Sequence, residues 1–202
     1  DAAFRLGVLW ETFQGAWHLA AISRDPSVFR GHLQGELNKA MPAEARRLVE
    51  AFEPRALTVP ANPKLPQIIK ALDPQGFNVT FVDAKAWNGS AQKHLGPAHA
   101  ARVNAIASDN EAASLIHLVK KLRNHLAHAS EGSKDEFNRA VRARVAPARV
   151  GLVGTANESL QRDARGVDDV GKYLRVRPIA GGPRRIEILH DRIEAVAGVL
   201  RT

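Results

Sequence analysis

The sequence has no cysteine, and this absence excludes two kinds of site at once. Neither disulfide bonds nor zinc sites built on thiolates can form. A chain without cysteine is typical of the cytoplasm, which is the location that we expect. Long apolar runs are also missing, since none approaches the roughly 20 residues that a membrane-spanning helix needs. We therefore expect no insertion into a membrane.

Aromatic residues and methionine are scarce. Aromatics make up 5% of the chain while apolar residues make up 45%, so the core is expected to consist mainly of Leu, Ile, Val and Ala, which suits helices better than a β-sandwich. The only methionine is Met41 and the sequence starts at Asp1. We therefore expect that the native chain extends beyond this segment.

Acidic residues are outnumbered, with 21 Asp and Glu against 29 Lys and Arg. The formal charge of +8 favours a polyanionic partner, and nucleic acid is the most common one. However, the chain has 20 Arg and only 9 Lys, a ratio that is also found in proteomes generally rich in arginine. Charge alone therefore leaves both explanations open.

Apolar residues recur at helical spacing along most of the chain. From Phe4 to Ser23 they predict a helix whose inward face is formed by five residues: Leu6, Leu9, Phe13, Trp17 and Ala20. Similar spacing predicts helices over residues 28–40, 65–72 and 97–107, and another after Pro42. Residues 186–200 repeat like a terminal helix, and residues 185–189 could begin that helix or form an extended strand before it. The expected fold class is all-α.

A segment with four prolines separates the first helices from the middle of the chain. Pro54, Pro60, Pro63 and Pro66 interrupt regular structure, and Gly76 lies in a predicted turn. Residues 77–82 alternate between apolar and polar side chains, which suits a strand. We therefore expect a loop interrupted by prolines, and the alternation allows a short β-hairpin after it.

The most informative stretch is 115–130, whose sequence is LIHLVKKLRNHLAHAS. On a helix, one face carries the apolar residues Leu115, Leu118, Val119, Leu122, Leu126 and Ala129. The opposite face carries the polar residues His117, Lys121, Asn124 and His128, and Arg123 lies between the two faces. One face is thus expected to anchor the helix while the other presents its polar groups.

Arg123, Asn124 and His128 resemble the motif of the HEPN superfamily, in which an Arg, a polar residue and three further residues precede a His. The resemblance implies one helical, HEPN-like domain over residues 1–202, with a helix-poor insert at about 54–96 and a C-terminal appendage at about 164–202. It implies a metal-independent endoribonuclease with catalytic Arg123, Asn124 and His128, acting as a homodimer. A toxin or anti-phage defence setting, and an antitoxin or regulatory protein as partner, come from the same resemblance.

A second match to the bare pattern occurs at Arg185 and His190. Its second position is Ile186 instead of a polar residue, and no leucine-rich helix leads into it. We therefore expect this match to be accidental.

RNA can be cleaved without a metal because its own 2′-OH is the nucleophile. His128 suits the role of the base, and Arg123 offers planar donors to the phosphate oxygens. Asn124 could orient His128 or could pack at an interface. The residues expected to bind RNA are Lys121, His117, His125, Arg139 and Arg142, with Arg144 and Arg149 close behind. Because a lysine interrupts the histidines, we expect neither a metal nor another cofactor.

Two other functions fit the same features. A non-catalytic HEPN-like module would bind RNA, a nucleotide or a partner protein through the same basic surface. A helical DNA-binding regulator is supported by charge alone. Cleavage of RNA but not of DNA would separate the ribonuclease from both, and salt-sensitive binding without cleavage would favour the module.

Overall fold

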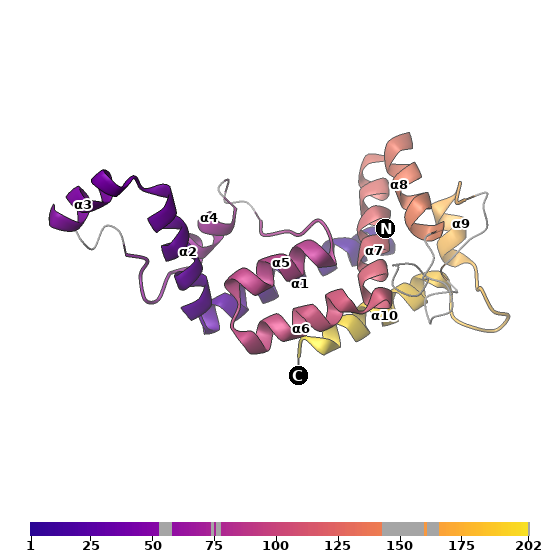
Figure 1. Cartoon of the computed structure of the whole chain (residues 1–202). Helices are drawn as coiled ribbons and strands as arrows, with labels where there is room; N and C mark the ends of the chain where they lie inside the picture. The colour runs from indigo at the N-terminus through magenta and orange to yellow at the C-terminus, as the bar shows by residue number, and fades with distance from the viewer. Residues whose placement is uncertain (53–57, 74, 76–77, 143–159, 161–165, 202) are drawn as a thin grey trace. The chain divides into compact units, whose positions relative to one another are not determined.

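The structure is a computed structural model that describes residues 1–52, 58–73, 75, 78–142, 160 and 166–201. These residues form ten helices and no strand, which confirms the all-α class (Figure 1). The helices are α1 Ala2–Arg24, α2 Ser27–Ala40, α3 Ala43–Phe52, α4 Leu65–Leu72, α5 Ala84–His94, α6 Pro97–Ser108, α7 Asn110–His128, α8 Glu131–Arg142, α9 Val170–Arg175 and α10 Arg185–Val199. No helix in the described part of the chain is both long enough and apolar enough to cross a membrane.

The chain divides into two compact units. Unit 1 consists of Asp1–Phe13, Phe81–Trp87 and Arg102–Thr202, and unit 2 consists of Gln14–Thr80 and Asn88–Ala101. Three of the four boundaries fall inside α1, α5 and α6, so these helices contribute residues to both units, and the fourth lies between Thr80 and Phe81, before α5. The motif helix α7 belongs to unit 1.

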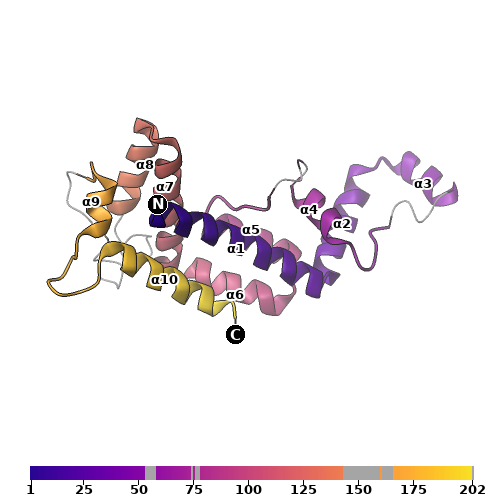
Figure 2. The ribbon, with the colours of Figure 1, turned by 180° about the vertical axis from the view of Figure 1, so that it is seen from behind.

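Unit 1 is built around α7 and α8, which lie side by side in Figures 1 and 2. Leu118 and Leu122 of α7 and Phe137 of α8 are fully buried. The ring of Phe137 meets Tyr173 of α9 edge to face, with the ring centroids 6.0 Å apart. Leu189 of α10 is also fully buried. These contacts make α7 a core helix whose position is fixed along most of its length.

Unit 2 has its own core. Phe29 of α2, Ile68 of α4 and Ile22 of α1 are at most 1% exposed. His18 of α1 is also completely buried, and its Nε2 lies 3.3 Å from the hydroxyl of Ser90 on α5. These helices therefore contribute to a shared apolar interior that includes the polar contact of His18 with Ser90.

The buried face of α1 differs from the predicted one. Leu9, expected to face inward, is 66% exposed, whereas Trp10 and His18 are at most 3% exposed. The buried face also contains Gly7 and Gly15. Because α1 has apolar residues on several sides, their spacing does not determine which face is buried. The small and polar residues on the buried face made the prediction fail.

The insert also differs from its prediction. Residues 78–82 form neither a helix nor a strand, and the expected β-hairpin is not found in the described part of the segment. The N–H of Asn78 donates to the side chain of Asp73 at 3.2 Å and not to a neighbouring strand. Helix α4 was predicted, but α5 was not. The Asp83 side chain accepts from the N–H of Ala86 at 2.7 Å and so caps the start of α5.

The sequence left open whether residues 185–189 begin the C-terminal helix or form a strand before it. Helix α10 begins at Arg185, so residues 185–189 are helical. The Glu187 side chain accepts from the N–H of Arg184 at 2.6 Å, which stabilises the first turn. Before it, the chain turns at Gly181, whose φ of +75° suits glycine.

Candidate active site

Helix α7 carries the motif beyond its buried part. Leu118 and Leu122 are completely buried, but Leu126, predicted on the same face, is 37% exposed. Ala129 was also predicted to pack, and it is exposed as well. The helix ends at His128 because Ala129 adopts a left-handed conformation with a φ of 48°. The buried part thus anchors α7, while the end that carries His128 faces solvent.

Arg123 is held on two sides. Its Nη1 donates to the amide oxygen of Asn124 at 3.0 Å, and its Nη2 lies 3.4 Å from Oε2 of Glu11 on α1. The Arg123 side chain is 31% exposed, and its buried Nε has no hydrogen-bond partner among the residues that the structure describes. The guanidinium is therefore positioned by its neighbours and still has unused donors.

Asn124 contacts Arg123 and not the histidine of the motif. Among the described residues, the side chains of Asn124 and His128 form no hydrogen bond with each other. His128 itself is exposed at the helix end. Five helical residues separate Arg123 and His128 by about 7.5 Å along the axis and about 140° around it. A single α7 helix therefore presents these two side chains in different directions.

Glu11 and Lys120 belong to this site but were not predicted. Glu11 is only 14% exposed, and Oε1 lies 4.0 Å from Nζ of Lys120. Lys120 also donates a hydrogen bond to the carbonyl of Phe81. Burial lowers the pKa of Lys120, whereas the nearby Glu11 carboxylate raises it. A single acid inside the apolar helix α1 was the available signal, because a carboxylate is rarely buried without a cation.

A glycine allows the close approach of α1 and α7. A Cβ at Gly7 would lie 2.5 Å from Cβ of Arg123 and 3.0 Å from Cγ. Gly7 and Glu11 are one turn apart on α1, so they contact the stem and the head of the same side chain. Helix α1 thus supports Arg123 along its length.

Two of the predicted RNA-binding residues connect α7 to α8. Nζ of Lys121 donates to Oε2 of Glu136 at 2.7 Å. The ring of His125 stacks on Phe137 with the centroids 6.0 Å apart, and its Nδ1 lies 3.2 Å from the hydroxyl of Ser133. Both side chains therefore stabilise the helix pair in addition to any role towards RNA.

His117 is half-buried on the same side of α7. Burial lowers its pKa most, and the nearby Lys121 ammonium lowers it further. Asp83 and Glu136 act in the opposite direction. Because the net shift is downward, the imidazole of His117 is mainly neutral near pH 7.

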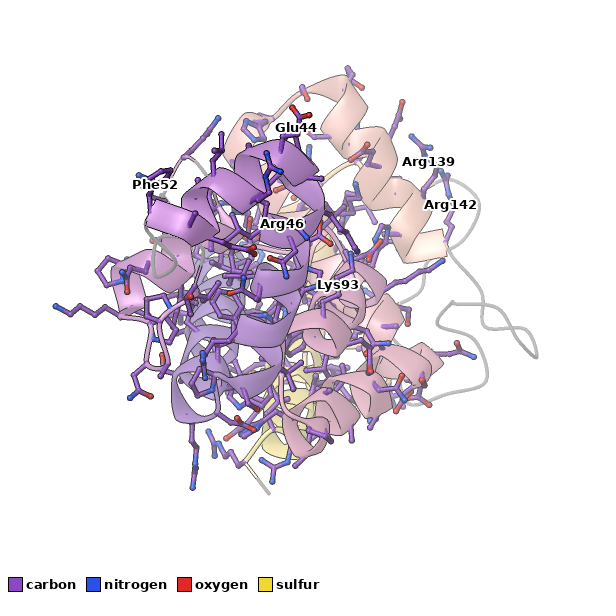
Figure 3. The ribbon with its side chains drawn as sticks, turned by 60° about the vertical axis from the view of Figure 1, so that its left-hand side comes forward. Glu44, Arg46, Phe52, Lys93, Arg139 and Arg142 are labelled. Atoms are coloured by element: carbon purple, nitrogen blue, oxygen red, sulfur yellow. The ribbon has the colours of Figure 1, made fainter. Side chains whose placement is uncertain are left out.

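Arg139 and Arg142 are exposed on α8, and Figure 3 shows both side chains on the outer side of this helix. Their position suits contact with a large anion. Arg144 and Arg149, predicted to extend the same basic patch, lie outside the described residues.

The second match to the motif has a different environment. The guanidinium of Arg185 lies over the ring of Tyr173, 4.7 Å from its centroid, and donates to the Tyr173 carbonyl at 3.2 Å. His190 is exposed, with its Nδ1 3.3 Å from the carboxylate of Asp191. Arg185 thus contributes to the packing of α9 and α10.

Within the described residues, no three His, Asp or Glu side chains are grouped so that they could hold a metal ion. No protein-family model, curated protein sequence or solved structure matches this chain.

Proposed function

We propose that this chain is a metal-independent endoribonuclease of the HEPN type. The observation that supports this most is the placement of Arg123, which Asn124 and Glu11 hold on a buried helix, with His128 exposed at the end of that helix. A fixed guanidinium can stabilise a phosphate that gains negative charge in the transition state. An exposed imidazole can accept a proton near neutral pH.

In the proposed reaction, His128 removes the proton of a ribose 2′-OH. The 2′-oxygen then forms a bond to the adjacent phosphorus, and the bond from phosphorus to the 5′-oxygen breaks. A protonated imidazole gives a proton to the leaving 5′-oxygen. The products are a 2′,3′-cyclic phosphate and a 5′-OH, and Arg123 stabilises the pentacoordinate phosphate.

The active form in this proposal is a homodimer with apposed α7 helices. Arg123 and His128 of one helix point about 140° apart, and a two-fold axis places a second set of both groups opposite the first. The exposed Arg139 and Arg142 would follow the RNA backbone, and His117, Lys121 and His125 would line its approach. Such an enzyme would act on RNA in the cytoplasm, as a toxin or anti-phage effector controlled by an antitoxin or another regulatory protein.

A non-catalytic HEPN-like module is the second candidate, and one observation favours it. Three of the proposed site residues already have polar partners within the chain. Arg123 pairs with Glu11, Lys121 pairs with Glu136, and His125 lies within hydrogen-bond distance of Ser133. In this case the chain would bind RNA, a nucleotide or a partner protein without cleaving anything.

Incubation of the purified protein with total RNA in excess EDTA tests the proposal. We expect cleavage of RNA, no cleavage of DNA, and no stimulation by magnesium. Binding of RNA that weakens with salt, without any cleavage, would favour the second candidate.

A further inference from the structure

Glu11 reaches the motif from a different helix. Its side chain is 14% exposed, and its two oxygens face two cations, with Oε2 3.4 Å from Nη2 of Arg123 and Oε1 4.0 Å from Nζ of Lys120. Oε1 accepts no hydrogen bond within the described part of the chain. The carboxylate is therefore shared between both cations and is not saturated by either.

The Glu11 carboxylate lies between two cations. Glu11 supplies one negative charge, and Lys120 and Arg123 supply two positive charges. Lys120 has a fixed place here, since it also donates to the carbonyl of Phe81. Asp83 also raises the pKa of Lys120, so the carboxylates that act on these cations include Glu11 and Asp83. Lys120 offsets part of the Glu11 charge that would otherwise act on Arg123 alone.

The stem of Arg123 is fixed by the same helix. Gly7 lies so close to Cβ of Arg123 that an added methyl group would overlap it. One turn later, Glu11 holds the Nη2 end, while Asn124 holds Nη1. An arginine side chain held at its stem and at both Nη atoms loses little freedom when its guanidinium binds a phosphate.

We propose that Glu11 is a positioning residue for Arg123, and that Lys120 is the counter-charge that keeps the guanidinium available to the scissile phosphate. This inference rests on the proposed ribonuclease function. Glu11 acts through Arg123 and does not touch the RNA. Without Glu11 the guanidinium would lose its orientation, and without Lys120 it would be neutralised by Glu11.

Steady-state kinetics of RNA cleavage separate the two roles. Glu11→Gln is expected to lower kcat about tenfold or more with KM unchanged or lower, because orientation is lost while positive charge is gained. Lys120→Met is expected to raise KM about tenfold, with a smaller change in kcat. The matched controls are Glu36→Gln and Lys39→Met, which remove the exposed 3.1 Å ion pair of α2 and should leave both constants within about twofold of wild type.

A spectroscopic measurement tests the positioning without relying on activity. In ¹⁵N-labelled protein the buried Nε–H of Arg123 should give a separate, slowly exchanging signal, assigned by its loss in Arg123→Lys. We expect this signal to disappear or broaden in Glu11→Gln and to remain in Glu36→Gln. If Glu11→Gln does not fold, Glu11→Asp replaces it. That variant keeps the charge on a shorter side chain, and we expect a lower kcat with KM unchanged.

The outcomes distinguish the inference from the function on which it rests. Cleavage by the wild type, together with a wild-type kcat and an unchanged Arg123 signal in the Glu11 variant, would overturn the positioning role alone. A wild type that does not cleave RNA, but whose Arg123 signal depends on Glu11, would contradict the ribonuclease and leave the positioning of Arg123 standing.

Discussion

At the scale of single residues, the two matches to the same pattern provide their own control. His128→Ala is expected to lower RNA cleavage about 10²-fold or more, which is the usual effect of losing a general base. Arg123→Ala should have a comparable effect through loss of phosphate stabilisation. His190→Ala should stay within a few-fold of wild type, because His190 is an exposed residue paired with Asp191. Cleavage assays on the three variants, with circular dichroism to verify folding, make the comparison.

Arg185→Ala is less suitable as a control. Its guanidinium covers Tyr173 and bonds to the Tyr173 carbonyl, so this variant would change packing as well as charge. An inactive His190 variant beside an active His128 variant would show that the wrong histidine had been chosen. Equal activity in all variants would show that neither site is responsible for the cleavage.

The buried His18 predicts a dependence of stability on pH. Burial, and then the neighbouring His94, lower its pKa from 6.5 to about 3. The unfolded chain therefore binds more protons than the folded one between these values, and stability falls as the pH drops from 6.5 towards 3. This one group contributes about 1.4 kcal/mol per pH unit within that window. Urea unfolding at pH 7, 6 and 5 measures the slope.

His18→Gln should reduce that slope by about the same 1.4 kcal/mol per pH unit, because glutamine does not titrate. The exposed His190→Ala is the matched control and should keep the wild-type slope. A His18 variant with an unchanged slope would contradict the assignment.

The sequence identified residues of the site unevenly. Arg123, Asn124 and His128 were candidates because they lie close together in one helix. Glu11 and Lys120 were missed because their contact joins residues more than a hundred positions apart, which no local pattern encodes. The partners of Lys121 and His125 lie close in sequence, at Glu136 and Ser133, but on the next helix α8, and they were missed because the contact depends on how α7 and α8 pack.

At the scale of the helices, Gly7 governs how closely α1 approaches α7. Gly7→Ala places a methyl group 2.5 Å from Cβ of Arg123, an atom fixed to the α7 backbone. We expect a loss of about 1–3 kcal/mol in the free energy of unfolding, since one helix must shift. Thermal unfolding followed by circular dichroism measures it.

Gly35→Ala is the control for helix propensity. Gly35 also lies inside a helix, but a Cβ there would meet nothing within 4 Å. This variant should gain about 0.5–1 kcal/mol, because alanine favours a helix over glycine. Two shifts of the same sign would argue against a close contact at Gly7.

The existence of helices was easier to predict than their faces. The leucine face of α7 was correct as far as Leu122, where apolar and polar residues separate clearly. In α1 the apolar residues surround the helix, and the buried Gly7 and His18 carry no apolar signal. The alternating residues 77–82, of which residue 77 lies outside the described part, were predicted as a strand, but a strand also requires a partner, which the sequence pattern does not supply.

At the scale of the whole molecule, the all-α class followed from composition and spacing, whereas the two compact units did not. Three of their four boundaries fall inside α1, α5 and α6, where no break in the helical pattern marks them. A unit of this kind is defined by contacts between distant segments, and these depend on helix packing instead of local propensity.

The proposed site requires two copies of the chain. We expect sedimentation velocity at micromolar concentration to show a homodimer, because one α7 helix presents Arg123 and His128 about 140° apart. A negative charge introduced at the exposed motif end, for example by Ala127→Glu, should shift the equilibrium towards monomer and lower activity in parallel. A monomer with full activity would contradict the proposal that the active site forms between two copies of the chain.

Analysis of the RNA ends tests the central claim most directly. A defined RNA is incubated with the protein in EDTA, and the new 3′ and 5′ ends are identified. A chain that uses His128 and Arg123 on the ribose 2′-OH should leave a 2′,3′-cyclic phosphate and a 5′-OH, and the products should disappear with His128→Ala. A 3′-OH with a 5′-phosphate, formed only when magnesium is present, would contradict the account.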